Sequence, residues 1–200
     1  MKIVILGPDG AGKTSVIAGL IEELNRKGRA VKMRYLKPFL FMPILSDPVT
    51  INVNPHGRPP RSALPSIAKI FGWFLEEGYA NLFQDKKENL LICDRYYHDL
   101  LIDPIRYRYG GPMWAARLIG KLMPRPAMWI LLDAPAEVLQ TRKQEVSAEE
   151  CARQRQAYLA FVRKQPKNVI VDASQSLDRV IAGVERAVTA AMMEYEGNRG

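Results

Sequence analysis

The sequence of 200 residues lacks most of the features that mark secreted, metal-stabilised or membrane proteins. Its only cysteines, Cys93 and Cys151, are far apart and have no metal-binding spacing, so we expect two buried, reduced thiols. No apolar run approaches the roughly 20 residues that a membrane helix needs, and the N-terminal residues predict a strand rather than an export signal. A long basic run or a basic–aromatic stripe, as nucleic-acid-binding proteins carry, is also missing. These absences predict a cytoplasmic protein with no membrane or nucleic acid as partner.

The composition is that of an ordinary globular protein, but the charge is unbalanced. Hydrophobic residues make up 48% of the chain and charged residues 25%, and the formal net charge is +8. Such an excess is typical of a solvated basic surface, or of an enzyme whose Lys and Arg side chains converge on a polyanionic ligand. The length suits one large domain, so we expect residues 1–200 to form a single domain.

The most informative stretch is residues 7–14, which read Gly-Pro-Asp-Gly-Ala-Gly-Lys-Thr. An apolar run precedes it and a helical pattern follows it, which is the context that the Walker A phosphate-binding pattern G-x-x-x-x-G-K-[ST] requires. The glycines let backbone N–H groups turn towards phosphate oxygens, Lys13 supplies a cation for the β- and γ-phosphates, and the Thr14 hydroxyl is a ligand for Mg²⁺. The alternative is a Gly-rich turn that matches by chance. The predicted nucleotide-binding residues here are Gly7, Asp9, Gly10, Ala11, Gly12, Lys13, Thr14 and Ser15.

Hydrophobic runs predict the fold around this loop. Five apolar runs, at residues 3–6, 30–36, 90–93, 128–132 and 168–172, alternate with segments of helical spacing. We therefore expect an α/β P-loop NTPase fold, in which a five-stranded parallel sheet has helices on both faces. Seven prolines interrupt residues 37–65, which predicts a long Pro-rich loop or insertion.

A second polar group follows the apolar run at residues 90–93. Asp94 ends an hhhhD pattern, so it can orient Mg²⁺ or its waters beside Thr14, and Arg95 is placed to bridge phosphates. A structural ion pair is the alternative for such an Asp-Arg pair. We prefer a catalytic role because ligands of parallel sheets bind at the carboxyl ends of the strands, where the phosphate loop also lies.

The chain resembles the thymidylate kinase family of P-loop nucleoside monophosphate kinases. The resemblance is carried by Gly-x-Asp-Gly-Ala-Gly-Lys-Thr, Cys-Asp-Arg-Tyr at 93–96, Leu-Leu-Asp-Ala-Pro-Ala-Glu-Val-Leu at 131–139, and Val-Ile-Val-Asp-Ala-Ser at 169–174. It implies ATP and Mg²⁺ as cofactors, transfer of the γ-phosphoryl group to a nucleoside monophosphate, and a homodimer.

The resemblance also implies roles for individual residues. In this family Asp9 holds the sugar hydroxyl of the acceptor, and Asp94 and Arg95 bind at its phosphate. Residues 142–150 resemble a short lid, from which a cation would stabilise the transferring group. The candidates for that cation are Arg142, Lys143, Arg153 and Arg155. Any of them could instead be an ordinary surface charge.

On the acceptor side the sequence departs from the family. The Arg-Glu-Pro-Gly-Gly stretch is missing, and Trp73 and Phe74 occur near the position of the base-reading Arg. These aromatic residues could stack on a base, or could belong to the core. Four extra arginines, Arg58, Arg61, Arg106 and Arg108, could recognise a different anion.

Two rival functions therefore stay open. A P-loop kinase could phosphorylate a non-nucleotide or alcohol acceptor, with Asp94 or Asp9 taking its proton, whereas a phosphate acceptor needs no base. The chain could also be an NTP-binding regulatory module with little turnover.

Overall fold

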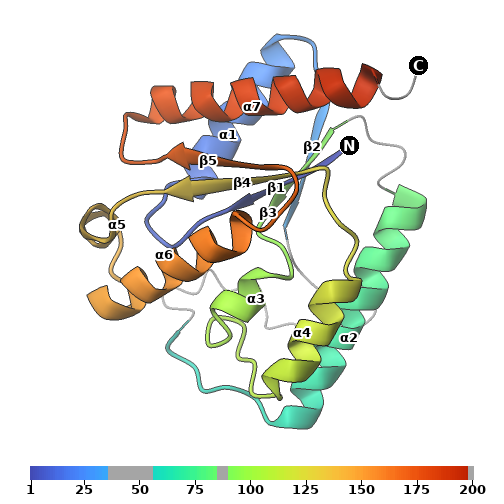
Figure 1. Ribbon diagram of the computed structural model, residues 1–200, viewed down its shortest axis with the longest axis vertical. Helices are drawn as coiled ribbons and strands as arrows, with labels where there is room; N and C mark the ends of the chain where they lie inside the picture. The colour runs from blue at the N-terminus through green and yellow to red at the C-terminus, as the bar shows by residue number, and fades with distance from the viewer. Residues whose placement is uncertain (36–55, 85–89, 198–200) are drawn as a thin grey trace. The chain divides into compact units, whose positions relative to one another are not determined.

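The computed structural model describes residues 1–35, 56–84 and 90–197. The chain forms two compact units (Figure 1). Unit 1 comprises Met1–Tyr35, Asp85–Tyr96 and Pro126–Gly200, and unit 2 comprises Leu36–Gln84 and Tyr97–Arg125. Most of the predicted Pro-rich loop, residues 37–55, lies outside the described residues.

Unit 1 is built on a five-stranded parallel sheet in the order β2-β3-β1-β4-β5. The strands are β1 (Lys2–Leu6), β2 (Val31–Tyr35), β3 (Leu90–Asp94), β4 (Met128–Asp133) and β5 (Asn168–Asp172). The three central strands are almost entirely buried, whereas β2 and β5 at the edges are only partly so. This burial explains the continuous apolar runs, because a central strand of a parallel sheet is covered on both faces. The predicted α/β class with a five-stranded parallel sheet is confirmed.

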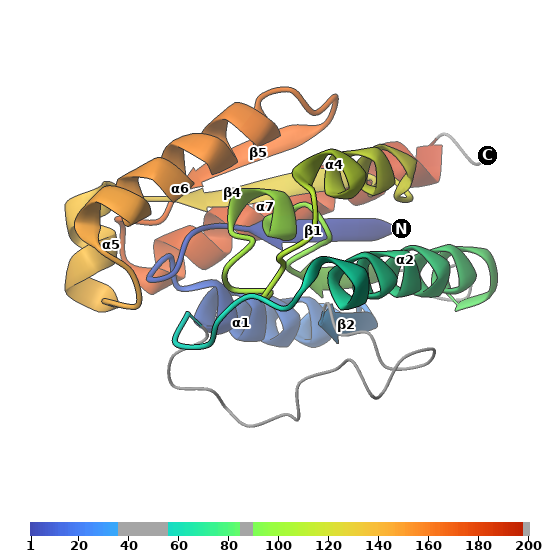
Figure 2. The same cartoon turned by 90° about the horizontal axis from the view of Figure 1, so that it is seen from below.

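Helices cover both faces of this sheet (Figure 2). On one face α1 (Lys13–Arg26) and α7 (Leu177–Gly197) pack side by side, and their residues Leu20 and Val184 join a core that includes Ile5 of β1. On the other face α6 (Ala148–Val162) packs on β4, where the rings of Phe161 and Trp129 meet edge to face at 5.1 Å. The short helix α5 (Ala136–Arg142) connects β4 to the segment that leads into α6.

Helix α6 begins after a serine, a residue type that is preferred at the N-cap position. Ser147 is the N-cap residue, and its hydroxyl accepts a hydrogen bond from the backbone N–H of Glu150 at 3.2 Å. Ser147 and Glu150 match the Ser-x-x-Glu capping-box pattern, and the structure shows the serine side of this motif.

Unit 2 contains α2 (Ala63–Tyr79), the π-helix η1 (Ala80–Gln84), α3 (Asp99–Ile102) and α4 (Met113–Leu122). Helix α2 begins two residues before the predicted end of the Pro-rich loop. Pro65 fits in its first turn because an N–H there has no partner within the helix. Helices α2 and α4 lie side by side in both views (Figures 1 and 2). The segment before α2 is joined to the loop before α4, since the backbone N–H of Arg61 donates to the carbonyl of Arg108 at 2.9 Å.

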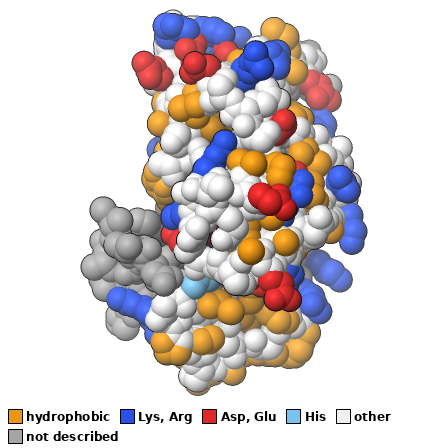
Figure 3. Space-filling model, turned by 90° about the vertical axis from the view of Figure 1, so that its left-hand side faces the viewer, with side chains coloured by type: hydrophobic (Ala, Val, Ile, Leu, Met, Phe, Trp, Pro, Cys, Tyr) orange, Lys and Arg blue, Asp and Glu red, His pale blue; other side chains and the backbone are white. Residues whose placement is uncertain are grey.

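The face drawn in Figure 3 carries its charge in a dispersed form. On the face drawn in Figure 3, Lys and Arg side chains lie among acidic and apolar ones rather than in a single tract. Within the described part of the chain, none of the helices combines the length and apolarity needed to cross a membrane.

Candidate functional site

The phosphate loop connects β1 to α1 and depends on glycine at one position above all. Gly10 has φ +84°, and a Cβ placed on it would lie 2.5 Å from the carbonyl oxygen of Leu139 in α5. Only glycine tolerates both the left-handed conformation and this close approach. Gly12, also left-handed, is the N-cap of α1, and no acidic side chain occupies the first turn of this helix. The positive end of the helix dipole is therefore available to an anion.

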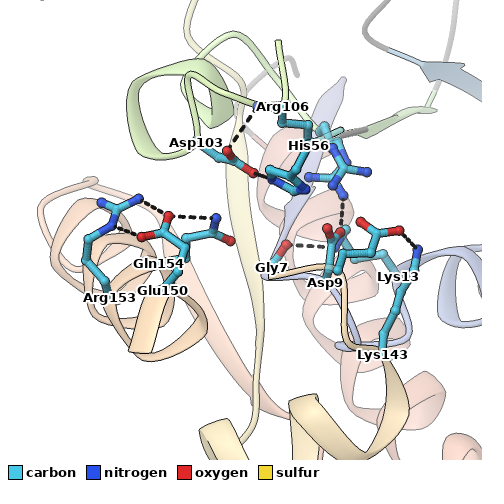
Figure 4. A network of polar contacts seen from close by, with 12 residues as sticks. Gly7, Asp9, Lys13, His56, Asp103, Arg106, Lys143, Glu150, Arg153 and Gln154 are labelled. Atoms are coloured by element: carbon cyan, nitrogen blue, oxygen red, sulfur yellow. Dashed lines mark hydrogen bonds and ion pairs between the residues drawn. The ribbon is translucent and has the colours of Figure 1, made fainter. Parts of the chain in front are cut away.

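Lys13 folds back over the loop. Its Nζ donates to the carbonyl oxygens of Gly7 at 2.6 Å and Pro8 at 2.8 Å, and the residue is buried (Figure 4). Thr14 and Ser15 follow in the first turn of α1 and are exposed. The ammonium group, the hydroxyl groups and the start of the helix thus lie together, as the sequence predicts.

Asp94 and Arg95 lie where β3 ends, beside the start of the loop. Asp94 is buried, and its register partner is Ile5 of β1. Arg95 adopts a left-handed backbone conformation with φ +68°, which costs an L-residue other than glycine about 1 kcal/mol. Its Nη2 donates to Oδ1 of Asp9 in the phosphate loop at 2.8 Å. The structure therefore brings together Asp9 and Arg95, which lie 86 positions apart in the sequence.

The four candidate lid cations lie in different places. Arg142 ends α5, and its Nη1 donates to the carbonyl of Ala173 at 2.7 Å. It lines a cavity of about 210 Å³ together with Gly12 and Ser15 of the phosphate-loop region. Lys143 pairs with Glu145, at 2.6 Å. Arg142 and Lys143 therefore lie beside the phosphate loop, Arg142 at the shared cavity and Lys143 through Glu145, which hydrogen-bonds Asp9.

The other two cations are held by partners in or near their own helix. Arg153 makes two hydrogen bonds of 2.6 Å to the Glu150 carboxylate, one turn away in α6 (Figure 4). Arg155 makes a bidentate pair with Asp133 at the end of β4, at 2.8 and 2.9 Å. The hydrogen bonds that Arg155 donates to Asp133 raise the pKa of Arg155 further above its usual range.

We expect Arg155→Ala to lower stability and leave the chemistry unchanged. Both residues are more than two-thirds buried, so loss of the bidentate pair should cost about 1.5–3 kcal/mol of unfolding free energy. Thermal unfolding and steady-state turnover check this, with Arg163→Ala at the exposed C-cap of the same helix as the control. A turnover loss without a stability loss would instead make Arg155 a lid cation.

Glu145 is a site residue that the sequence interpretation missed. Its side chain is 7% exposed, and its carboxylate lies within 4.8 Å of that of Asp9. Burial raises the pKa of Glu145, a hydrogen bond with Asp9 raises it further, and Lys143 opposes the rise. An acidic residue two positions after a candidate lid cation was the available signal.

The residues that we expected to recognise the acceptor, namely Trp73 and the four extra arginines, lie in unit 2. Trp73 is 2% exposed, and its ring meets Tyr97 and Tyr107 edge to face at 6.1 and 5.5 Å. The structure thus confirms the core alternative for this residue. Of the four extra arginines, Arg108 donates through Nε to the carbonyl of Pro59 at 3.1 Å. The two segments that carry these arginines are joined further by His56 and Asp103, at 2.8 Å (Figure 4).

Comparison with known proteins agrees with the motifs. No protein-family model matches the chain. It is similar to the thymidylate kinase of Pediococcus pentosaceus, with 24% identity over 87% of this chain and 90% of the relative. It is also similar to that of Limosilactobacillus fermentum, with 26% identity over 92% of both chains. A probable thymidylate kinase of Archaeoglobus fulgidus is 28% identical over 94% of both. These matches confirm the resemblance, and the chain is thymidylate kinase-like.

Proposed function

We propose that the protein is an ATP- and Mg²⁺-dependent kinase that transfers the γ-phosphoryl group to a nucleoside monophosphate. The observation that carries the proposal is the juxtaposition, in unit 1, of the phosphate loop with Asp94 and with the Asp9–Arg95 pair. Phosphoryl transfer needs positioning and charge neutralisation more than covalent chemistry, and these residues supply both. The names of the three relatives support a nucleotide as acceptor.

On the donor side, the residues around α1 fit a nucleoside triphosphate. Lys13 would exchange its carbonyl partners for phosphate oxygens, because a charged group gains more from an ionised acceptor than from a neutral one. The cavity beside Gly12 and Ser15 has polar side chains from Arg142 and Gln175 and apolar ones from Leu177 and Val180. This mixed lining suits the flat face and polar edge of a base.

For the metal, Thr14 and Asp94 offer the donors that Mg²⁺ prefers. A hydroxyl in the first turn of α1 and a carboxylate at the end of β3 are oxygen ligands, and Mg²⁺ keeps its remaining positions for water and phosphate. The bound ion would supply neutralisation of charge on the phosphates.

On the acceptor side, Arg95 would bind the acceptor phosphate and Asp9 a sugar hydroxyl. The left-handed backbone at Arg95 and its bond to Asp9 fix the guanidinium before the acceptor arrives. Lys143 is linked to this pair through Glu145, so it is the candidate lid cation that we assign to the acceptor groups. Roles for Arg142 as a catalytic cation, for Arg153 as a donor-binding residue and for residues 142–150 as a lid stay predictions.

One observation favours an alcohol acceptor as a second candidate. Asp9 and Glu145 share a hydrogen bond, and Glu145 has a raised pKa, so the pair can accept a proton from a reacting hydroxyl. We also propose that the protein acts in the cytoplasm, which the two buried thiols Cys93 and Cys151 support.

Release of ADP from ATP and Mg²⁺, measured with nucleoside monophosphates, nucleosides and sugar phosphates in turn, tests the proposal. We expect a monophosphate to give the highest turnover, and Glu145→Gln to leave this reaction within about threefold of wild type, because a phosphate acceptor needs no base. A nucleoside or sugar as best acceptor, with a loss of about 10²-fold in Glu145→Gln, would favour the alcohol kinase. No acceptor-dependent ADP would favour the regulatory module.

A further inference from the structure

Unit 1 contains a cavity of about 490 Å³ at the end of α1 that is remote from the phosphate loop. It is lined by residues 27–30, which connect α1 to β2, by Met1 in front of β1, and by Met192, Tyr195 and Glu196 of α7. The cavity thus lies at the amino ends of β1 and β2, whereas the phosphate loop follows the carboxyl end of β1. The 14 residues of α1 hold the two places about 20 Å apart. We call this space the α1-end cavity.

The turn that lines the α1-end cavity is fixed by the way in which α1 ends. Gly28 has φ +72°, and the backbone N–H groups of Gly28 and Arg29 donate to the carbonyls of Asn25 and Leu24, both at 2.9 Å. This is the Schellman arrangement, which ends a helix at a glycine and uses its last carbonyls. The side chains of Lys27 and Arg29, on either side of the glycine, therefore set the charge of this wall of the cavity.

Cations outnumber carboxylates around the cavity. Lys27 pairs with Glu185, and Arg29 donates to Glu196 through a single contact of 3.2 Å. The two cations are 55% and 41% exposed, so these ion pairs are weak and can be exchanged for a stronger acceptor. Lys27 also borders a second hollow of about 370 Å³, where the exposed Arg186 adds a third cation. A phosphate is the stronger acceptor, because it offers a guanidinium group two parallel charged hydrogen bonds.

The other wall of the cavity is mainly apolar. Met1 and Met192 are buried, at 8% and 7% exposure, and Tyr195 beside them is 36% exposed. Methionine sulfur atoms contact aromatic rings favourably, and a tyrosine ring can stack on another ring. The cavity therefore combines an apolar wall that suits a flat ring with a basic turn that suits an anion.

We propose that the α1-end cavity binds a small aromatic phosphate, the class of compound to which nucleotides belong. Its phosphate group accepts hydrogen bonds from Lys27 and Arg29. Its ring lies against Met1, Met192 and Tyr195. The volume of about 490 Å³ falls within the range of about 300–1,000 Å³ that small-molecule sites occupy. The inference does not depend on the proposed kinase activity, because the phosphate loop lies at the other end of α1.

NMR spectra of protein labelled with ¹³C at the methionine methyl groups, recorded during titration with AMP, test the proposal. We expect AMP to shift the signal of Met192, which Met192→Leu assigns. Adenosine and inorganic phosphate, titrated separately, should each bind at least about 10-fold more weakly, because each lacks half of the contacts. The AMP-dependent shift should persist in a variant that carries both Lys13→Ala and Arg95→Ala, since neither residue lines the cavity.

Arg29→Ala and Lys27→Ala should each raise the dissociation constant of AMP at this site by about 10–100-fold, because each removes a charged hydrogen-bond donor. Arg179→Ala is the matched control. It removes the same charge from an exposed position at the other end of α7, outside the cavity, and should keep the affinity of the wild type. Thermal unfolding verifies that the variants stay folded.

Three results would overturn the proposal. The first is a Met192 signal that does not move at millimolar AMP. The second is a shift that neither Arg29→Ala nor Lys27→Ala weakens. The third is a shift that disappears in the variant with Lys13→Ala and Arg95→Ala, because AMP would then bind at the phosphate loop and act on Met192 through α1.

Discussion

Lys13→Ala should reduce turnover with ATP and Mg²⁺ by on the order of 10³-fold or more. The Nζ of Lys13 lies within 2.8 Å of two carbonyls of the phosphate loop. Alanine removes that charge from the position where the β- and γ-phosphates are proposed to bind. The carbonyls of Gly7 and Pro8 would lose a partner, which costs about 1–3 kcal/mol and leaves the protein folded.

The measurement is ADP release at saturating acceptor, with thermal unfolding as the check on folding. Lys164→Ala is a suitable control, because it removes the same charge from an exposed position of unit 1 and should retain full turnover. Rates like those of the wild type in Lys13→Ala would show that residues 7–14 do not hold the transferred phosphate.

The strands and the phosphate loop could be predicted because their signals are local. The runs ending at Leu6, Cys93 and Leu132 are continuous because β1, β3 and β4 lie at the centre of the sheet. Ser147 and Glu150 are three residues apart, so their hydrogen bond is visible in the sequence. Local patterns of this kind need no knowledge of the tertiary fold.

The partners of the site's cations could not be predicted, since they depend on contacts between distant segments. Arg142 bonds to Ala173, 31 positions away, and Arg155 to Asp133, 22 positions away. The sequence shows four basic residues around a possible lid, but only the packing of α5 and α6 separates their roles. The short helix α3 also escaped prediction, because it is not long enough to show a period.

The division into two units could not be predicted from the sequence for a related reason. Unit 2 combines Leu36–Gln84 with Tyr97–Arg125, and the strand β3 lies between these segments in the sequence. In unit 2, Trp73 of α2 packs against Tyr97 and Tyr107, which lie in the turns before and after α3, and the spacing of these residues forms no pattern along the chain. An aromatic residue on an apolar helix face fits a core or a base-stacking role equally well until those neighbours are known.

The acceptor should not be chiefly thymidine monophosphate, although three relatives carry the name thymidylate kinase. The family's base-reading Arg and its Arg-Glu-Pro stretch are missing from the sequence. Trp73, one of the two aromatic residues near the position of that Arg, is enclosed by Tyr97 and Tyr107 within unit 2. A site that lacks a hydrogen bond to its substrate can lose ~10⁴–10⁵-fold in discrimination.

We therefore expect kcat/KM for thymidine monophosphate to fall below about 10⁴ M⁻¹s⁻¹ and to be exceeded by that of another monophosphate. Trp73→Phe separates a packing role from base reading. Because the indole Nε1 has no hydrogen-bond partner among residues 1–35, 56–84 and 90–197, this change should cost about 1–2 kcal/mol of stability through lost volume. It should leave the ratio of kcat/KM values between acceptors unchanged. If thymidine monophosphate is used efficiently and Trp73→Phe lowers its kcat/KM alone, the residue reads thymine and the protein is an ordinary thymidylate kinase.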